Sequence, residues 1–130
     1  MSPEREETMK ILIIAMTVST LALLNGASGW AGMGQAGPLK TQPGSAATKH
    51  NEEGIKHYTA GHWDVAKEHF VDAVMADPKS AEAHYNVALV LDKMGDHTGA
   101  TEHFKMAKDL GKSNSEIQDS GILKAHLKMK

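Results

Sequence analysis

Residues 66–73, Ala-Lys-Glu-His-Phe-Val-Asp-Ala, recur 34 positions later as residues 100–107, Ala-Thr-Glu-His-Phe-Lys-Met-Ala. The match extends outward when residues 47–80 are placed over residues 81–114, because histidines and glycines also coincide. Agreement at one fixed offset, including the whole tripeptide Glu-His-Phe, indicates an internal repeat. The sequence therefore predicts two consecutive repeats with these bounds.

Each repeat is expected to form a hairpin of two helices. In the first repeat, Ala66, Phe70 and Ala73 are spaced by four and three residues, which places them on one face of a helix. Gly61 is expected to end the preceding helix, because glycine readily adopts the left-handed conformation found at helix ends. Asp64 is the expected N-cap of the second helix, and Pro78 is expected to end it. The predicted fold class is therefore all-α.

A fifth helix is expected over residues 115–130. Ser113 and Glu116 have the spacing of a capping box, in which each side chain accepts a hydrogen bond from the backbone of the other. The last repeat of an array exposes an apolar flank that another element must cover. Isoleucine and leucine side chains in residues 115–130 supply the apolar side of such a capping helix.

These residues resemble the tetratricopeptide repeat family, whose members form short or long α-solenoids of helical hairpins. The resemblance covers residues 47–114, and the capping helix would complete the packing. His50 and His84 depart from the family pattern, because they stand where an aromatic residue is usual. The matching structural positions are Gly54, Gly61, Ala66, Phe70, Ala73 and Pro78 in the first repeat, and Ala88, Gly95, Ala100, Phe104 and Ala107 in the second.

The resemblance implies a concave groove that is lined by the first helix of each repeat and receives a peptide or a helix of a partner protein. Tyrosines are favoured at binding hot spots, and an asparagine can hold a peptide backbone through a donor and an acceptor together. An alternative is that the two tyrosines simply pack between helices. The groove residues carried over by position are Asn51, Ile55, Tyr58, Tyr85, Asn86, Leu89 and Asp92.

Residues 1–31 are predicted to be a secretory signal peptide. Ile11–Leu24 is a mostly apolar, uncharged run that follows a lysine and precedes small residues. Acidic residues before Met9 do not suit an export signal, so we expect the true start to be Met9. The run is shorter than the roughly 20 residues of a membrane-spanning helix; an uncleaved anchor or a buried helix is the alternative. Residues 32–46, rich in glycine and proline, are predicted to form a flexible linker.

The eight histidines raise the question of a metal site. Zinc needs three or four ligands that converge on one point, and no two histidines have the three- or four-residue spacing that achieves this on a helix. We therefore predict no metal and no cofactor, although a site formed across helices stays open. His50 and His84 are expected to pack in place of aromatic residues, and His69 and His103 are expected to be solvated.

Composition narrows the function further. The chain has no cysteine and a formal net charge of −2, which gives no thiolate chemistry and no electrostatic reason to bind nucleic acid. Phosphate-binding loops, nucleophile elbows and other catalytic motifs are absent from the sequence, so we predict no enzyme. The function predicted is a periplasmic or secreted adaptor that binds a protein or peptide partner and keeps no membrane span after signal cleavage. The alternatives are a histidine-based metal- or cofactor-handling protein, and a structural subunit that assembles with an envelope complex or with itself.

Overall fold

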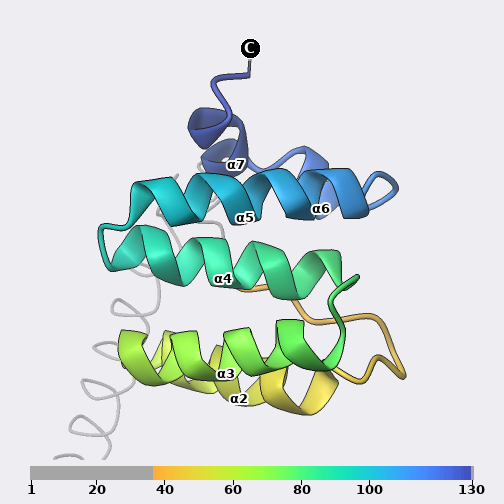
Figure 1. Cartoon of the computed structure of the whole chain (residues 1–130), viewed down its shortest axis with the longest axis vertical. Coiled ribbons are helices and arrows are strands. Elements are labelled where there is room, and N and C mark those ends of the chain that lie inside the picture. The colour runs from red at the N-terminus through yellow and green to blue at the C-terminus, as the bar shows by residue number, and fades with distance from the viewer. Residues whose placement is uncertain (1–36, 130) are drawn as a thin grey trace, which may run out of the picture. The chain divides into compact units, whose positions relative to one another are not determined.

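The computed structural model describes residues 37–129, and within this range the chain is helical without strands (Figure 1). The predicted signal peptide and residues 32–36 of the predicted linker lie outside the described residues. None of the described helices has the length and apolar character that a membrane span requires. The helices, in chain order, are α2 (Thr48–Thr59), α3 (Trp63–Ala76), α4 (Ala81–Lys93), α5 (His97–Leu110), α6 (Ser115–Gln118) and α7 (Gly121–His126).

The four long helices form two hairpins that stack on each other. α2 packs on α3, α4 packs on α5, and α3 packs on α4, so that the two hairpins form one helical array (Figure 1). Gly61 and Gly95 lie in the hairpin turns with φ angles of 78° and 84°, a conformation that glycine adopts without steric strain. The all-α, repeat-like fold class is therefore confirmed.

The repeated alanines and phenylalanines make the core between the helices. Phe70 and Phe104 are completely buried, as are the alanines on either side of each. Gly54 lets α2 approach α3 closely, because a Cβ atom built on it would lie 2.5 Å from the Phe70 ring. Ala88, at the equivalent position of α4, is also completely buried. Small residues thus set the distance between the helices, and the phenylalanines fill the space that remains.

The N-terminal caps of the helices agree only in part with those predicted from the sequence. Ser80 caps α4 by accepting a hydrogen bond from Ala83 N at 3.2 Å. The prediction that Asp64 caps α3 is wrong, because α3 already begins at Trp63, before Asp64, and its N-cap residue is His62, which forms no side-chain cap. The Trp63 ring packs edge-on against Tyr58, with centroids 5.0 Å apart. Asp64 instead lies in the first turn, where a negative charge is favoured by the helix dipole.

The prediction of one continuous capping helix over residues 115–130 is wrong. The chain forms the short helices α6 and α7, and the caps are Asn114, which accepts from Glu116 N at 3.0 Å, and Ser120. Ile117 and Leu123 are both completely buried. Six positions apart on a straight helix, these side chains would point about 120° apart around the axis, so the break is what allows both to reach the core.

Candidate functional site

The residues predicted to line a groove do not form an open surface. Asn51 and Tyr58 on α2 and Tyr85, Asn86 and Leu89 on α4 are buried, while Ile55 and Asp92 are half-buried. Residues 37–47, here called the N-terminal segment, run past α4 in Figure 1 and hydrogen-bond to both α2 and α4. The chain therefore places its own segment over the face where a partner peptide was expected.

An asparagine pair holds the backbone of Leu39. Asn86 accepts a hydrogen bond from Leu39 N at 2.7 Å and donates one to Leu39 O at 2.7 Å. Asn51 donates a second hydrogen bond to Leu39 O at 2.8 Å. The two amides are also joined directly, because Asn86 Nδ2 donates to Asn51 Oδ1 at 2.7 Å. Both backbone polar groups of Leu39 are thereby hydrogen-bonded.

The pair depends on this contact because both asparagine side chains are completely buried. Buried polar groups that lack a partner are strongly unfavourable, so nearly all of them are paired in folded proteins. Without a peptide backbone at the position of Leu39, the only bond left to the two amides among those described above would be the one between them. The backbone of Leu39 thus supplies the partners that the two buried amides need.

Further contacts position the rest of the N-terminal segment. Gln42 Nε2 donates to Glu82 Oε1 on α4 at 3.0 Å, and Ser45 Oγ donates to Asp77 Oδ2 after α3 at 2.7 Å. The Leu39 side chain packs against the core cluster. As predicted, residues 37–46 have no helix or strand, but their contacts do not match a flexible linker. One feature of the sequence could have indicated these contacts: Leu39 is the single large apolar residue, proline aside, between Gly34 and Gly54.

No protein-family model matches the chain, and no curated protein matches it. The resemblance to tetratricopeptide repeats therefore stays a prediction that rests on the residues. A helical repeat fold hosts many functions, so the fold alone does not identify the function of this chain.

The two tyrosines do not take part in peptide recognition in this structure. Tyr85 is hydrogen-bonded to Ser120 Oγ at 2.8 Å and packs edge-on against Phe104. Tyr58 packs between Trp63 and Phe70. Burial raises the pKa of both phenols. The alternative, that the tyrosines pack between helices, describes them better than a mixed tyrosine–asparagine groove.

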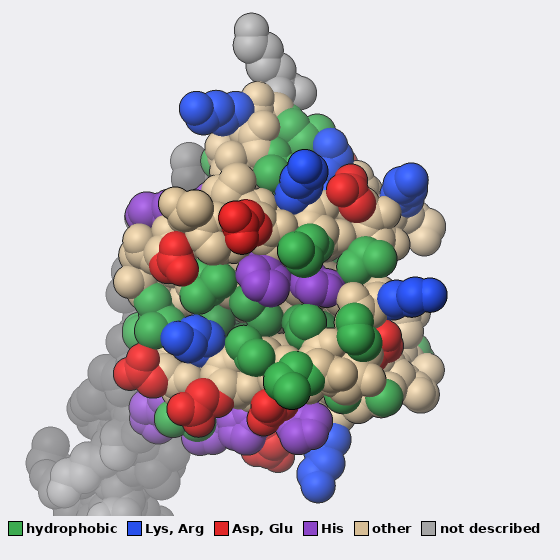
Figure 2. Space-filling view, in the orientation of Figure 1, with side chains coloured by type: hydrophobic (Ala, Val, Ile, Leu, Met, Phe, Trp, Pro, Cys, Tyr) green, Lys and Arg blue, Asp and Glu red, His purple; other side chains and the backbone are tan. Residues whose placement is uncertain are grey.

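The histidines gather into groups that sequence spacing did not reveal, and Figure 2 shows such groups on one face of the molecule. His84 Nδ1 and His103 Nδ1 lie 3.1 Å apart. The pKa of His103 is lowered, mainly because the ring is partly buried and to a smaller extent because His84 is close. His103 and His69 were expected to be solvated, and both are half-buried instead. Helix packing brings these residues together from distant positions, which is why pair spacing along one helix missed them.

Proposed function

We propose that this chain is an exported interaction module that binds an extended peptide segment of a partner protein across α2 and α4. The observation that carries the proposal is the buried Asn51–Asn86 pair and its three hydrogen bonds to the backbone of Leu39. Backbone groups are common to every peptide, so the same pair suits a segment from another protein. The resemblance to tetratricopeptide repeats supports the same face as a binding surface.

The contacts of Leu39 describe the ligand. It is an extended peptide that presents one free N–H and C=O to the asparagines and an apolar side chain to the core cluster. A polar residue three positions further on would replace Gln42, which donates to Glu82. Because the N-terminal segment occupies this position, a partner has to displace it. The apparent affinity for the partner is therefore the intrinsic affinity multiplied by the fraction of molecules in which the segment is released.

Export is the second part of the proposal. Residues 1–31 have the arrangement of a secretory signal, so we place the mature chain in the periplasm or outside the cell. The proposed role of the module there is to bind a peptide segment of a partner protein, and the proposal includes no catalytic step.

A labelled peptide of residues 36–46 tests the binding function directly. The full chain with Leu39→Asp should release its own segment and bind this peptide, as measured by fluorescence anisotropy, whereas the wild-type chain should bind it more weakly. Adding Asn86→Ala to Leu39→Asp should abolish binding, and adding Glu52→Ala, at an exposed neighbour of Asn51, should not. Equal binding with and without Asn86 would rule out the proposed site.

A further inference from the structure

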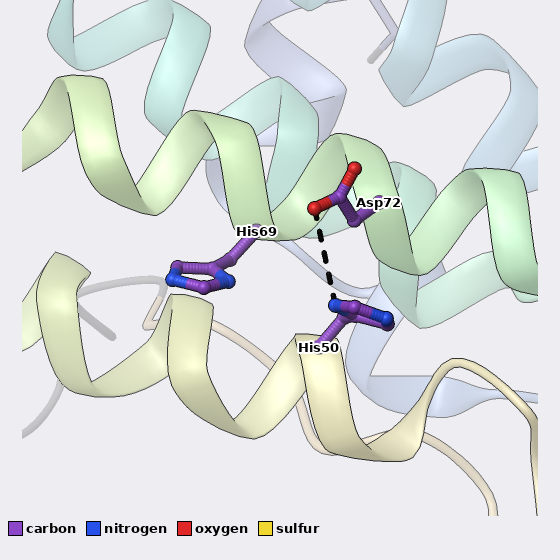
Figure 3. A group of neighbouring side chains, drawn as sticks. All are labelled: His50, His69 and Asp72. Carbon is purple, nitrogen blue, oxygen red and sulfur yellow. Dashed lines mark ion pairs between the residues drawn. The ribbon is translucent and has the colours of Figure 1, made fainter.

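A group of three side chains spans the two helices of the first hairpin. His50 comes from α2, and His69 and Asp72 come from α3 (Figure 3). Their possible ligand atoms all lie within 4.8 Å of one another, and His50 Nδ1 lies 3.9 Å from Asp72 Oδ2. Ligands around a tetrahedral zinc ion are about 3.3 Å apart, as follows from bonds of about 2.0 Å. Small rotations of these side chains would therefore let all three reach one ion.

His69 supplies an independent sign that a ligand belongs here. Its Nδ1 atom is buried and has no hydrogen-bond partner among the described residues. The ring is held by stacking on His57, with centroids 5.4 Å apart and planes inclined by 12°. A buried polar atom without a partner calls for an explanation such as an ion, and a neighbouring imidazole and carboxylate make an ion the fitting one.

A second group, also of two histidines and one aspartate, has no such buried atom that lacks a partner among the described residues. Asp92, His97 and His126 also lie close together, but His126 Nε2 and His97 Nδ1 already contact the same oxygen, Asp92 Oδ1, at 2.9 and 3.0 Å. His126 Nδ1 is paired with Thr101 Oγ1 at 3.0 Å. These hydrogen bonds account for the second group without a metal.

We propose that His50, His69 and Asp72 bind a divalent transition-metal ion of the zinc type between α2 and α3. Two imidazole nitrogens and one carboxylate oxygen suit zinc, cobalt, nickel and copper, whereas magnesium and calcium prefer ligand sets made only of oxygen. Three protein ligands leave a fourth position for water or another ligand. The ion would join the two helices of one hairpin, so binding should also stabilise the fold.

The residue pattern on α3 is consistent with this site. His69 and Asp72 are three positions apart and therefore share one face of the helix, and His50 faces them from the neighbouring helix. The spacing of the histidines alone does not indicate this site, because one of its ligands on α3 is an aspartate. The proposed metal site does not include the asparagine pair, so the metal proposal and the peptide-binding proposal can be tested independently.

Titration calorimetry of the full, tag-free chain with zinc chloride tests the proposal. We expect one zinc ion per chain and at least about tenfold weaker binding in His50→Gln, His69→Gln and Asp72→Asn, since even residues that only support ligands have effects of this size. The matched control, His97→Gln in the second group, should bind as the wild type does. Magnesium chloride should give no heat of binding.

Two further measurements keep the test decisive if one variant folds poorly. Cobalt should give the visible absorption of a four-coordinate site in the wild type and lose it in Asp72→Asn, whose side chain is exposed. Zinc should raise the melting temperature of the wild type and of His97→Gln but not that of His50→Gln. Absence of binding to the wild type, or loss in His97→Gln with retention in the three site variants, would overturn the assignment.

Discussion

Asn51 and Asn86 are 35 positions apart in the chain, yet both donate a hydrogen bond to the same oxygen atom, the carbonyl of Leu39. The first hairpin contributes one amide and the second hairpin the other, so their alignment depends on how the hairpins stack. Binding of the N-terminal segment therefore depends on how the two hairpins stack, and a change in that stacking should release the segment.

Replacing Asn86 with alanine should release the N-terminal segment and weaken the fold. The substitution removes the two hydrogen bonds that Asn86 forms with Leu39, and it leaves Asn51 with one partner fewer. Loss of such buried bonds is expected to reduce the free energy of unfolding by about 1–3 kcal/mol, as measured by urea denaturation. Trypsin should also cleave after Lys40 faster than in the wild type, whereas cleavage after Lys49, within α2, should change much less. Unchanged cleavage after Lys40 would mean that the asparagine pair does not hold the segment.

Replacing Gly54 with alanine should separate α2 from α3. The added Cβ atom would lie 2.5 Å from two atoms of the buried Phe70 ring, and overpacking of this kind is expected to cost about 1–3 kcal/mol of unfolding free energy. Gly121→Ala is the matched control, because nothing lies within 4 Å of a Cβ atom built there. Thermal or urea denaturation of the two variants checks this, and equal stability would argue against close helix contact at Gly54.

Replacing Ser120 with alanine should loosen the C-terminal cover of the array. Ser120 caps α7 and is hydrogen-bonded to the buried Tyr85 hydroxyl, so its loss should cost about 1–2 kcal/mol. Hydrogen exchange should accelerate in α7 more than in α2. The exposed Ser115 provides a matched Ser→Ala control, and a similar loss of stability there would remove the special role of Ser120.

The hairpins could be predicted from the sequence because their signals are local or repeat at one offset. Glycines mark the turns, and alanine and phenylalanine recur at helical spacing. The break between α6 and α7 could not be predicted in this way, since Ser120 is fixed by a tyrosine on α4. The same holds for the position of Leu39 and for the histidine groups, which exist only once helices from distant parts of the chain have packed together.

Acidification should weaken the fold through His103. Burial and the neighbouring His84 lower the pKa of His103, and Glu102 opposes this shift. The folded state therefore favours the neutral ring, while the unfolded chain takes up a proton below about pH 6.5. The contribution of His103 is thus fully present above that pH and is lost as the pH falls toward the lower pKa of the folded state.

The urea midpoint should accordingly be lower near about pH 5.5 than near about pH 7.5, where histidines change charge. Other histidines also contribute to this difference, so the informative quantity is how it changes on substitution. His103→Leu should reduce the pH dependence because no proton is taken up at that position on unfolding. The exposed His62 supplies the control, and His62→Gln should retain the wild-type difference. If His103→Leu retained it in full, the partly buried His84–His103 contact would not be the source of the acid sensitivity.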